Sequence, residues 1–578
     1  MLLSIPTPLP PSREYYDLGT YSRPITTVSP DAQIWFDRGL NWCYAFNHTE
    51  GLKCFLQAIA HDPVCAMAYW GIAYAAGPNY NKAWGLFDPK DLSRTMKLCF
   101  ESSRKAEELF GPTTAGTPIE RQLISAMCSR YPFDHEAKDY DTINVEYDRA
   151  MHKVYDSFPG DLDVMTLYVD AKMHIAQRKM FDIHSGLPVE TSPVYDIQHL
   201  FRIAMQHPDA KIHPGILHFS IHFWEMSATP DIALPGANHL RGLVPDAGHL
   251  HHMPSHLDVL KGDYQNAVAS NAAAVIADNK YLAKEGAKNM YSFYRLHNYH
   301  SLIYAAMLSG QSKIALDALD PMESSLTEDV LRVENPPLAD WLEFFLSVRV
   351  HVYIRFGMWK ELKALTLPLD KALYCVTTVM THYGKAIAYA ATGEIVHAET
   401  QRRLYLAAKK LVPETRRDYP NRIVDILEVA SAMLNGEIEY RKGNFEKAFA
   451  SLRSAICLDD GLRYTEPWGW MIPTRHAYAA LSLEQGLVDQ AAAAYAEDLG
   501  LQGHLTRAHQ HPNTIWSLLG YHECLRKSGR TKEAEQIKQR LDAASHIADV
   551  EIRSSCFCRT GAMEVDRISR CADGKSCT

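Results

Sequence analysis

The stretch FNHTEGLKCFLQAIAHDPVCAMAYWGIAYA, residues 46–75, decides how the rest of the chain is interpreted. It places a small residue at Gly51, an alanine at Ala58 and a proline at Pro63, after which a new helical pattern begins. Small residues are needed where two helices cross closely, and proline fits where a helix has already ended. The spacing therefore predicts a pair of closely crossing helices, followed at once by another helix.

Three later stretches repeat this arrangement. GEIEYRKGNFEKAFASLRSAICLDD (436–460) carries glycine and alanine at the corresponding places. LEQGLVDQAAAAYAEDL (483–499) and LRKSGRTKEAEQIKQRL (525–541) each have a turn glycine followed five residues later by an alanine. On these residues the chain resembles the tetratricopeptide repeat (TPR) family. Since strand signals are nearly absent, we expect an all-α fold, a TPR-like solenoid of helical hairpins.

Length and charge limit the classes of protein. At 578 residues the chain is too long for one compact core, unless it is a repeat array that grows in one direction. A net charge of −9 gives no basic excess, so nucleic acid is not an expected partner. No run of eighteen apolar residues is present, so no membrane-spanning helix is expected. The first residues do not have the pattern of a secretory signal, which predicts a cytoplasmic protein.

The ends of the chain differ in composition from its middle. We predict a proline-rich N-terminal arm at 1–30, a TPR-like α-solenoid at 31–545 and a flexible, cysteine-containing tail at 546–578. Four cysteines lie in that tail, whereas the other eight occur singly in helical patterns. Isolated cysteines of this kind are typical of small buried hydrophobes in a reducing compartment.

Histidine is concentrated in one part of the chain. Nine of the 27 histidines fall within residues 207–256. HFSIHFWE places His218, His222 and Glu225 at positions i, i+4 and i+7. On a helix these three side chains lie on one stripe and point to one region.

A second group follows one repeat later. GHLHHMPSHL places His249, His252 and His256 at i, i+3 and i+7, and the last two follow their counterparts in the first group by 34 residues. Thirty-four residues is the TPR period. Pro254 weakens the argument for one continuous helix here, because proline disfavours helical geometry at the preceding residue. We expect the helix either to begin at Pro254 or to be kinked there.

The resemblance to TPR proteins also implies where these side chains face. In that family, fixed positions of the first helix of each repeat line the concave groove. By this resemblance the two histidine groups face inward, and a third repeat, anchored on Gly310 and Ala315, adds His297 and His300.

The same segments resemble a set of TPR proteins of unassigned activity from fungi and bacteria, with shared runs HPGxxHxxIHxxE and AGHLxHMPSHI. Here they are HPGILHFSIHFWE (213–225), AGHLHHMPSHL (247–257) and HNYHSL (297–302). The resemblance extends to residues 46–81 and 511–520, and so covers most of the chain. It implies no particular reaction.

Imidazole nitrogens with one carboxylate suit a transition metal rather than calcium or magnesium. We predict a centre within about residues 213–300 that favours Fe or Cu, with Zn or Mn as alternatives. The predicted metal ligands are His218, His222, Glu225, His252 and His256. The residues predicted to act on a substrate are His249, His297 and His300. The other interpretation is that these histidines serve packing or line a peptide groove.

Three functions fit this pattern. The first is a metal-dependent oxidoreductase that acts on a small molecule in the concave groove. The second is a metal-dependent hydrolase or lyase, in which a metal-bound water reacts. The third is a TPR scaffold that binds a peptide without catalysis. The sequence contains no Gly-rich phosphate loop, no HExxH helix and no GxSxG motif.

Overall fold

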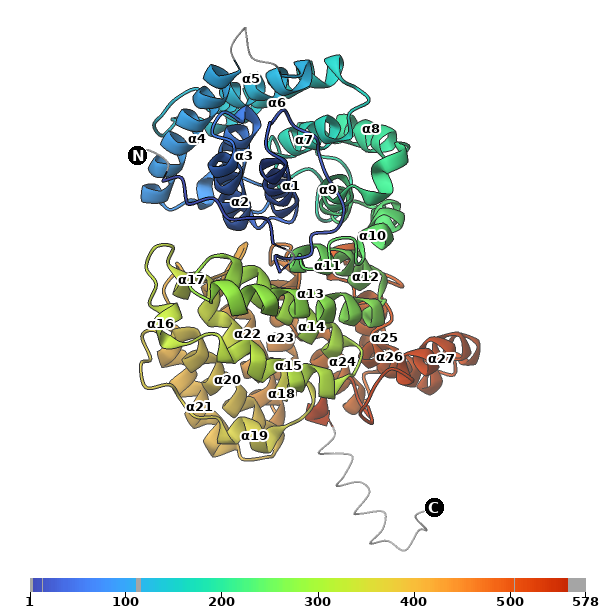
Figure 1. Cartoon of the computed structure of the whole chain (residues 1–578). Coiled ribbons are helices and arrows are strands. Elements are labelled where there is room, and N and C mark those ends of the chain that lie inside the picture. Colours follow the sequence, from blue (N-terminus) through green and yellow to red (C-terminus); the bar gives the residue numbers. More distant parts are fainter. Residues whose placement is uncertain (1–3, 13, 111–115, 504, 560–578) are drawn as a thin grey trace, which may run out of the picture. The chain divides into compact units, whose positions relative to one another are not determined.

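The computed structural model describes residues 4–12, 14–110, 116–503 and 505–559. Within them the fold is all-α, apart from one two-stranded hairpin of β1 (Arg417–Asp418) and β2 (Asn421–Arg422). The predicted all-α fold of helical hairpins is confirmed (Figure 1). No helix of the described residues is long and apolar enough to span a bilayer.

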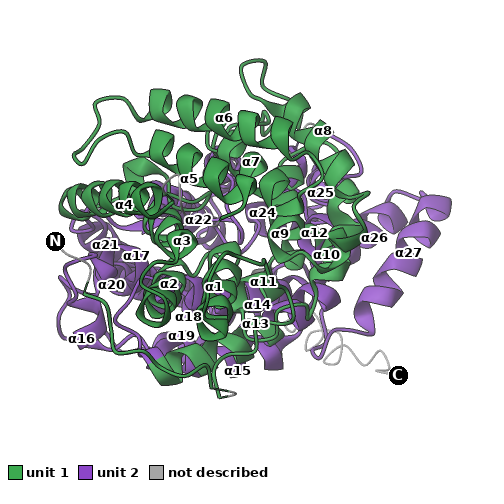
Figure 2. Ribbon diagram, turned by 45° about the horizontal axis from the view of Figure 1, so that its top comes forward, with its two compact units in different colours: residues 1–257, 273–284 green, residues 258–272, 285–578 purple. Residues whose placement is uncertain are grey.

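The chain divides into two compact units, which Figure 2 colours separately. Unit 1 comprises residues 1–257 and 273–284, and unit 2 comprises residues 258–272 and 285–578. The repeat pattern did not reveal this division. The predicted boundaries at residues 30 and 545 stay predictions, and residues 560–578, with Cys571 and Cys577, lie outside the described part.

Unit 1 begins with an extended segment and continues as helices. Its helices are α1 (Pro30–Tyr44), α2 (His48–His61), α3 (Ala66–Ala76), α4 (Pro89–Leu109), α5 (Pro118–Arg130), α6 (Tyr140–Ser157), α7 (Leu162–Met173), α8 (Val194–Ala204), α9 (Pro214–Trp224), α10 (Leu234–Leu240) and α11 (Gly248–His252), with 3₁₀ turns η1 (Trp84–Leu86), η2 (Pro208–Ile212) and η3 (Pro230–Ala233). Helices α12 (Pro254–Lys261) and α13 (Tyr264–Glu285) contain residues of both units.

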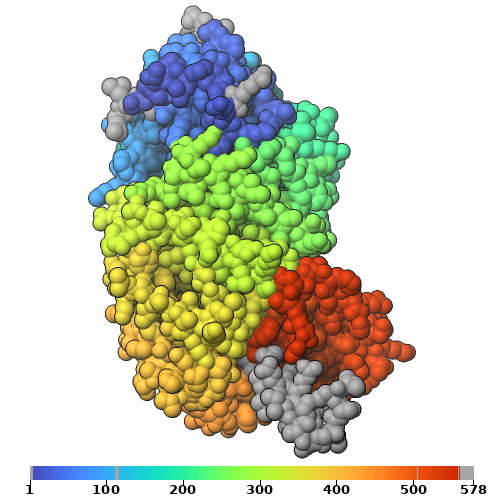
Figure 3. All heavy atoms as spheres, turned by 60° about the horizontal axis from the view of Figure 1, so that its bottom comes forward, coloured from blue at the N-terminus to red at the C-terminus, as the bar shows by residue number. Residues whose placement is uncertain are grey.

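Unit 2 continues the helical pairs, and its later helices give the orange and red surface of Figure 3. Its helices are α14 (Tyr291–Leu308), α15 (Ser312–Ser324), α16 (Glu328–Leu331), α17 (Leu338–Leu342), α18 (Val348–Arg355), α19 (Trp359–Ala364), α20 (Cys375–Ala391), α21 (Ile395–Lys409), α22 (Ile423–Arg441), α23 (Phe445–Asp460), α24 (Thr474–Glu484), α25 (Val488–Asp498), α26 (Ile515–Lys527) and α27 (Thr531–Ser545), with η4 (Glu343–Ser347), η5 (Arg507–His509) and η6 (Phe557–Arg559).

The small residues of the repeat pattern lie where two helices touch. A Cβ at Gly51 of α2 would stand 2.8 Å from the Cys43 sulfur of α1, and one at Gly436 would stand 2.6 Å from Leu452 of α23. The hairpin α22–α23 turns at Gly443, which has a φ of +77° that favours glycine. The repeat spacing therefore predicted these crossings correctly.

One prediction about the cysteines is wrong. Seven of the eight isolated cysteines are buried, as expected, but Cys457 is exposed. It lies on the outer side of α23, whose buried residues include Ala448, Leu452 and Ala455. Because residue 457 is off this stripe, its sulfur faces solvent.

Candidate metal centre

Helix α9 carries the first two histidines into the interior of unit 1. Pro214 occupies its first turn, and the His213 side chain caps it by accepting a hydrogen bond from the Ile216 amide at 3.2 Å. Every residue from Pro214 to Trp224 is buried. An apolar helix with histidines at i and i+4 thus forces two polar rings into a dry environment.

The second histidine group comes from two short helices. Helix α11 ends at His252 and α12 begins at Pro254, so the helix is interrupted where the proline predicts. Gly248 opens α11 against α13, since a Cβ there would stand 2.0 Å from an Asp278 carboxylate oxygen. This close approach sets the position of His249, the next residue.

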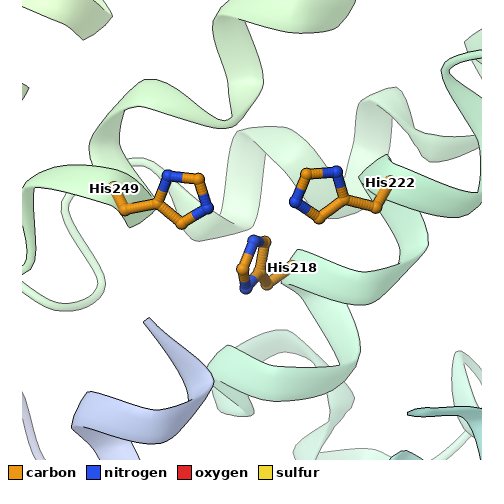
Figure 4. Close-up of side chains that lie close together, drawn as sticks. All are labelled: His218, His222 and His249. Carbon is orange, nitrogen blue, oxygen red and sulfur yellow. The ribbon is translucent and has the colours of Figure 1, made fainter. Parts of the chain in front are cut away.

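Three rings form the core of the site. His218, His222 and His249 each offer a ring nitrogen, and these atoms lie within 4.8 Å of one another. Figure 4 shows the three rings turned toward a common point, two from one helix and one from another. Ligands of one zinc ion lie about 3–3.5 Å apart when each bond is about 2.0–2.1 Å, so a small contraction would let all three bind one ion. His249, predicted to act on a substrate, is therefore placed among the candidate ligands.

For His218 and His222, hydrogen bonds determine which ring nitrogen faces the centre. His218 donates from Nδ1 to the Tyr44 carbonyl at 2.6 Å, and His222 donates from Nδ1 to the Glu225 carboxylate at 3.1 Å. Each Nε2 is then the nitrogen with the lone pair. Both Nε2 atoms are buried and have no hydrogen-bond partner among the described residues. Metal-bound histidines are typically held in this way, with the second nitrogen donating to a carbonyl or carboxylate.

Glu225 joins the two histidine groups. Its second carboxylate oxygen accepts a hydrogen bond from His256 Nδ1, and His256 Nε2 lies 2.7 Å from His252 Nε2. Glu225, His222 and His256 also place ligand atoms within 4.8 Å of one another. We refer to the five rings and this carboxylate as the histidine cluster: His218, His222, Glu225, His249, His252 and His256.

Phe46 covers the cluster. Its ring centroid lies 4.4 Å from that of His218, and it stacks on His222 and His249 at 5.6 and 5.4 Å. Its φ is +58°, a left-handed conformation that is costly for an aromatic residue. Strain of this kind is typical of sites where one side chain must take a fixed position.

Burial keeps the rings neutral. It lowers the pKa of His218 to about 3, and it lowers the pKa of His222 and of His249 well below the usual value. Neutral imidazole is the form that binds a metal, so no proton has to leave these rings at pH 7.

The burial also differs from the prediction of an open groove. All six side chains of the histidine cluster belong to residues that are at most 4% exposed. These side chains therefore present almost no surface to solvent. A closed set of protein donors is typical of structural metal sites, whereas catalytic sites keep an open position.

The remaining predicted residues belong to the other unit. His297 and His300 lie on α14, where His297 stacks on Phe293 and His300 packs on Phe344 and Phe345. Burial lowers the pKa of His300 to about 3. Their predicted part in the centre stays a prediction.

Sequence reasoning missed the contributions of the α1–α2 turn. The Tyr44 carbonyl and the Phe46 ring both contact the cluster, yet they lie more than 170 residues before it in the chain. The only signal was the FNH run at 46–48, which belongs to the family resemblance.

No family model and no curated protein matches the chain. Among solved structures, the chain is similar to yeast Tom70 (11% identity, TM-score 0.28, 89% of this chain and 93% of that one). It is also similar to the P58(IPK) TPR domain (10%, 0.19, 87% and 99%) and to Ypp1 (11%, 0.25, 89% and 73%). At these identities the likeness concerns only the helical-repeat fold.

The predicted oxidoreductase is wrong by these comparisons. One of these structures is titled a TPR domain, and no title names a catalytic activity. The burial of the histidine cluster is the physical reason, because its six residues are at most 4% exposed.

Proposed function

We propose that this chain is a non-catalytic helical-repeat scaffold whose unit 1 is held together by one buried transition-metal ion. The ion binds His218, His222 and His249 through their ring nitrogens. The observation that carries the proposal is the pair of buried Nε2 atoms that have no hydrogen-bond partner among the described residues. A buried polar atom without a partner costs about 1–3 kcal/mol, and a metal bond removes that cost.

The donors indicate the kind of ion. Three imidazole nitrogens suit Zn, Cu or Fe, and the carboxylate of Glu225 already accepts hydrogen bonds through both oxygens. We propose that Glu225 orients His222 and His256 and that imidazole nitrogens make the metal bonds. His256 and His252 are the nearest further donors for a fourth position.

The ion would link two separate helices of unit 1. His218 and His222 belong to α9, and His249 belongs to α11. Helical repeats contact mainly their neighbours, so a bond between separate helices adds stability that repeat packing does not supply. A rigid array of hairpins can then present a surface to a peptide or protein partner, which is the role proposed for the chain.

Metal analysis of the purified full chain tests this proposal. We expect about one ion per chain after reconstitution with Zn, Cu, Fe or Mn. His218→Ala and His222→Ala should each lose the ion. His135→Ala is the matched control, because His135 is an exposed histidine of the same unit.

A Co²⁺-substituted sample gives a second readout. Coordination by imidazoles in a tetrahedral site should give visible absorption bands that disappear in His222→Ala and persist in His135→Ala. Failure of all four metals to bind the wild-type chain would exclude the proposed centre. Binding that survives in both ligand variants would place the metal elsewhere.

A further inference from the structure

Unit 1 contains a second site, which is separate from the histidine cluster. It is a pocket of about 710 Å³ between α8, α9 and α10. Pockets that hold small molecules have volumes of about 300–1,000 Å³. Its lining residues include Phe201, Arg202, Met205, Lys211, Leu217 and Trp224.

The floor of the pocket is apolar and deep. Phe201 and Leu217 are 2% and 1% exposed, so the pocket reaches the core of the unit. At its mouth, Tyr195 is 72% exposed, Ile232 is 56% exposed and Met205 is 38% exposed. Large apolar side chains gathered around an opening mark a surface that a ligand covers. Methionine also adapts its shape to different apolar ligands.

The charged groups of the pocket have one sign. Arg202 and Lys211 line it, and none of its lining residues is an aspartate or glutamate. Neither cation forms an ion pair with a carboxylate in the described part of the chain, and Arg202 donates a hydrogen bond to His199 Nδ1 at 2.8 Å. Asp196, the acidic residue of α8, pairs with Lys172 at 3.3 Å. The pocket therefore offers two positive charges without a protein partner of opposite charge.

We propose that this pocket binds a small amphipathic carboxylate, with its hydrocarbon chain on the floor and its carboxylate at Arg202 and Lys211. Guanidinium and ammonium groups form strong, charge-assisted hydrogen bonds to a carboxylate. A single hydrocarbon chain fits a pocket of this volume that reaches Phe201 and Leu217.

Helix α9 is the wall between this pocket and the histidine cluster. Leu217, Ser220 and Trp224 face the pocket, whereas His218 and His222 face the cluster. The two sets lie on different stripes of one helix. The carboxylate site does not depend on the proposed metal, since its lining residues and the metal ligands share no side chain.

Dodecanoate is the probe for the test, below its micelle concentration and with the full chain. We expect binding at one site with a Kd of about 10 μM or lower, measured by titration calorimetry. Methyl dodecanoate, which keeps the chain but lacks the charge, should bind at least about tenfold more weakly.

Two variants locate the ligand. Arg202→Gln combined with Lys211→Gln removes the charges and should weaken dodecanoate binding at least about tenfold. Gly236→Leu adds a side chain on the α10 wall, where a Cβ meets no atom closer than 3.4 Å, and should weaken both probes. Arg149→Gln is the control, because Arg149 is an exposed cation of α6 outside the pocket.

Three results would overturn the proposal. The first is no binding of dodecanoate by the wild-type chain. The second is equal binding by the wild type and the double variant, which would show that the charges do not hold the carboxylate. The third is displacement of dodecanoate by an acidic amphipathic peptide with a lower Kd than dodecanoate itself, which would show a protein-docking surface.

Discussion

Each unit buries histidines beside a carboxylate, but the two groups are completed differently. In unit 2, Asp498 accepts hydrogen bonds from His476 at 3.0 Å and from His511 at 2.8 Å. Arg355 donates to the other nitrogen of His476 at 2.8 Å, and Tyr304 donates to the other nitrogen of His511, also at 2.8 Å. We call these residues the Asp498 network. All four of its histidine ring nitrogens have partners in the protein.

The histidine cluster of unit 1 has five rings for one carboxylate. Glu225 serves His222 and His256, and a backbone carbonyl serves His218, but the Nε2 atoms of His218 and His222 have no hydrogen-bond partner among the described residues. A closed network stabilises the fold by itself. In the metal site proposed above, these two oriented nitrogens bind the ion. We therefore base the proposal of a metal site on the hydrogen-bond partners of each ring nitrogen, and not on the number of histidines.

The largest expected effect is loss of the Asp498 network. Asp498→Ala leaves its two histidines and Ser517 without their shared acceptor, so we expect unfolding of unit 2 to become easier by about 3–5 kcal/mol. Chemical denaturation monitored by hydrogen exchange in α24–α26 measures this. A decrease in unfolding free energy of less than about 1 kcal/mol would show that the network contributes little to the stability of unit 2. The contrast drawn between the two units would then be wrong.

Low pH should reduce the difference in unfolding free energy between the wild type and Asp498→Ala. Burial raises the pKa of Asp498, but His476 and His511 outweigh it and hold the pKa well below its usual range. A depressed folded-state pKa contributes stability above the unfolded pKa of about 3.9, and this stability is lost as pH falls below it. The difference in the free energy of unfolding of unit 2 between the wild type and Asp498→Ala should therefore be about 1 kcal/mol smaller at pH 3 than at pH 7. A gap that widens at pH 3 would refute this assignment.

The second effect concerns only unit 1. Metal at 100 times its Kd should stabilise the unit that binds it by about 2.7 kcal/mol. Hydrogen exchange should slow in α9 and α11 when metal is added and stay unchanged in α24–α26. His222→Leu should abolish this gain, whereas Asp498→Ala should keep it. Equal protection of both units by metal would contradict a site confined to unit 1.

Local spacing explains what the sequence could and could not predict. The turn glycines and helix crossings follow from residues close together in the chain, as at Gly51 and Gly443. The convergence of α9 and α11 followed from the 34-residue repeat. The deep burial of the histidine cluster could not be predicted from this repeat, because it depends on the Phe46 ring and the Tyr44 carbonyl from a distant turn. The hydrogen bonds from His222 and His256 to Glu225 were not predicted either, since spacing alone does not assign partners to its two oxygens.

A third, smaller effect tests that role of Glu225. Glu225→Gln keeps the shape of the side chain, but its amide nitrogen cannot accept a hydrogen bond, so either His222 or His256 loses its acceptor. Loss of such a partner typically weakens metal binding by about 10–100-fold, which corresponds to about 1.4–2.7 kcal/mol. Competition with a chelator of known affinity measures the Kd. Complete loss of binding would show instead that Glu225 is itself a metal ligand.

The smallest effect separates the strain at Phe46 from the cover that it provides. Both units place a non-glycine residue with positive φ next to their histidines: Phe46 at +58° in unit 1 and Asn513 at +60° in unit 2. Asparagine tolerates this conformation, whereas an aromatic residue does not, so the strain at residue 46 is retained for its ring. Phe46→Ala and Phe46→Gly remove the same ring, but only glycine also relieves the backbone. We therefore expect Phe46→Gly to be more stable than Phe46→Ala by about 1 kcal/mol, although glycine usually destabilises a folded chain relative to alanine.

Both variants should bind metal more weakly than wild type, because water then reaches the rings of His218 and His222. Thermal unfolding of the two variants, with and without metal, gives both quantities. If Phe46→Ala proves the more stable, the left-handed conformation carries no strain. If both variants keep wild-type metal affinity, the ring does not protect the centre.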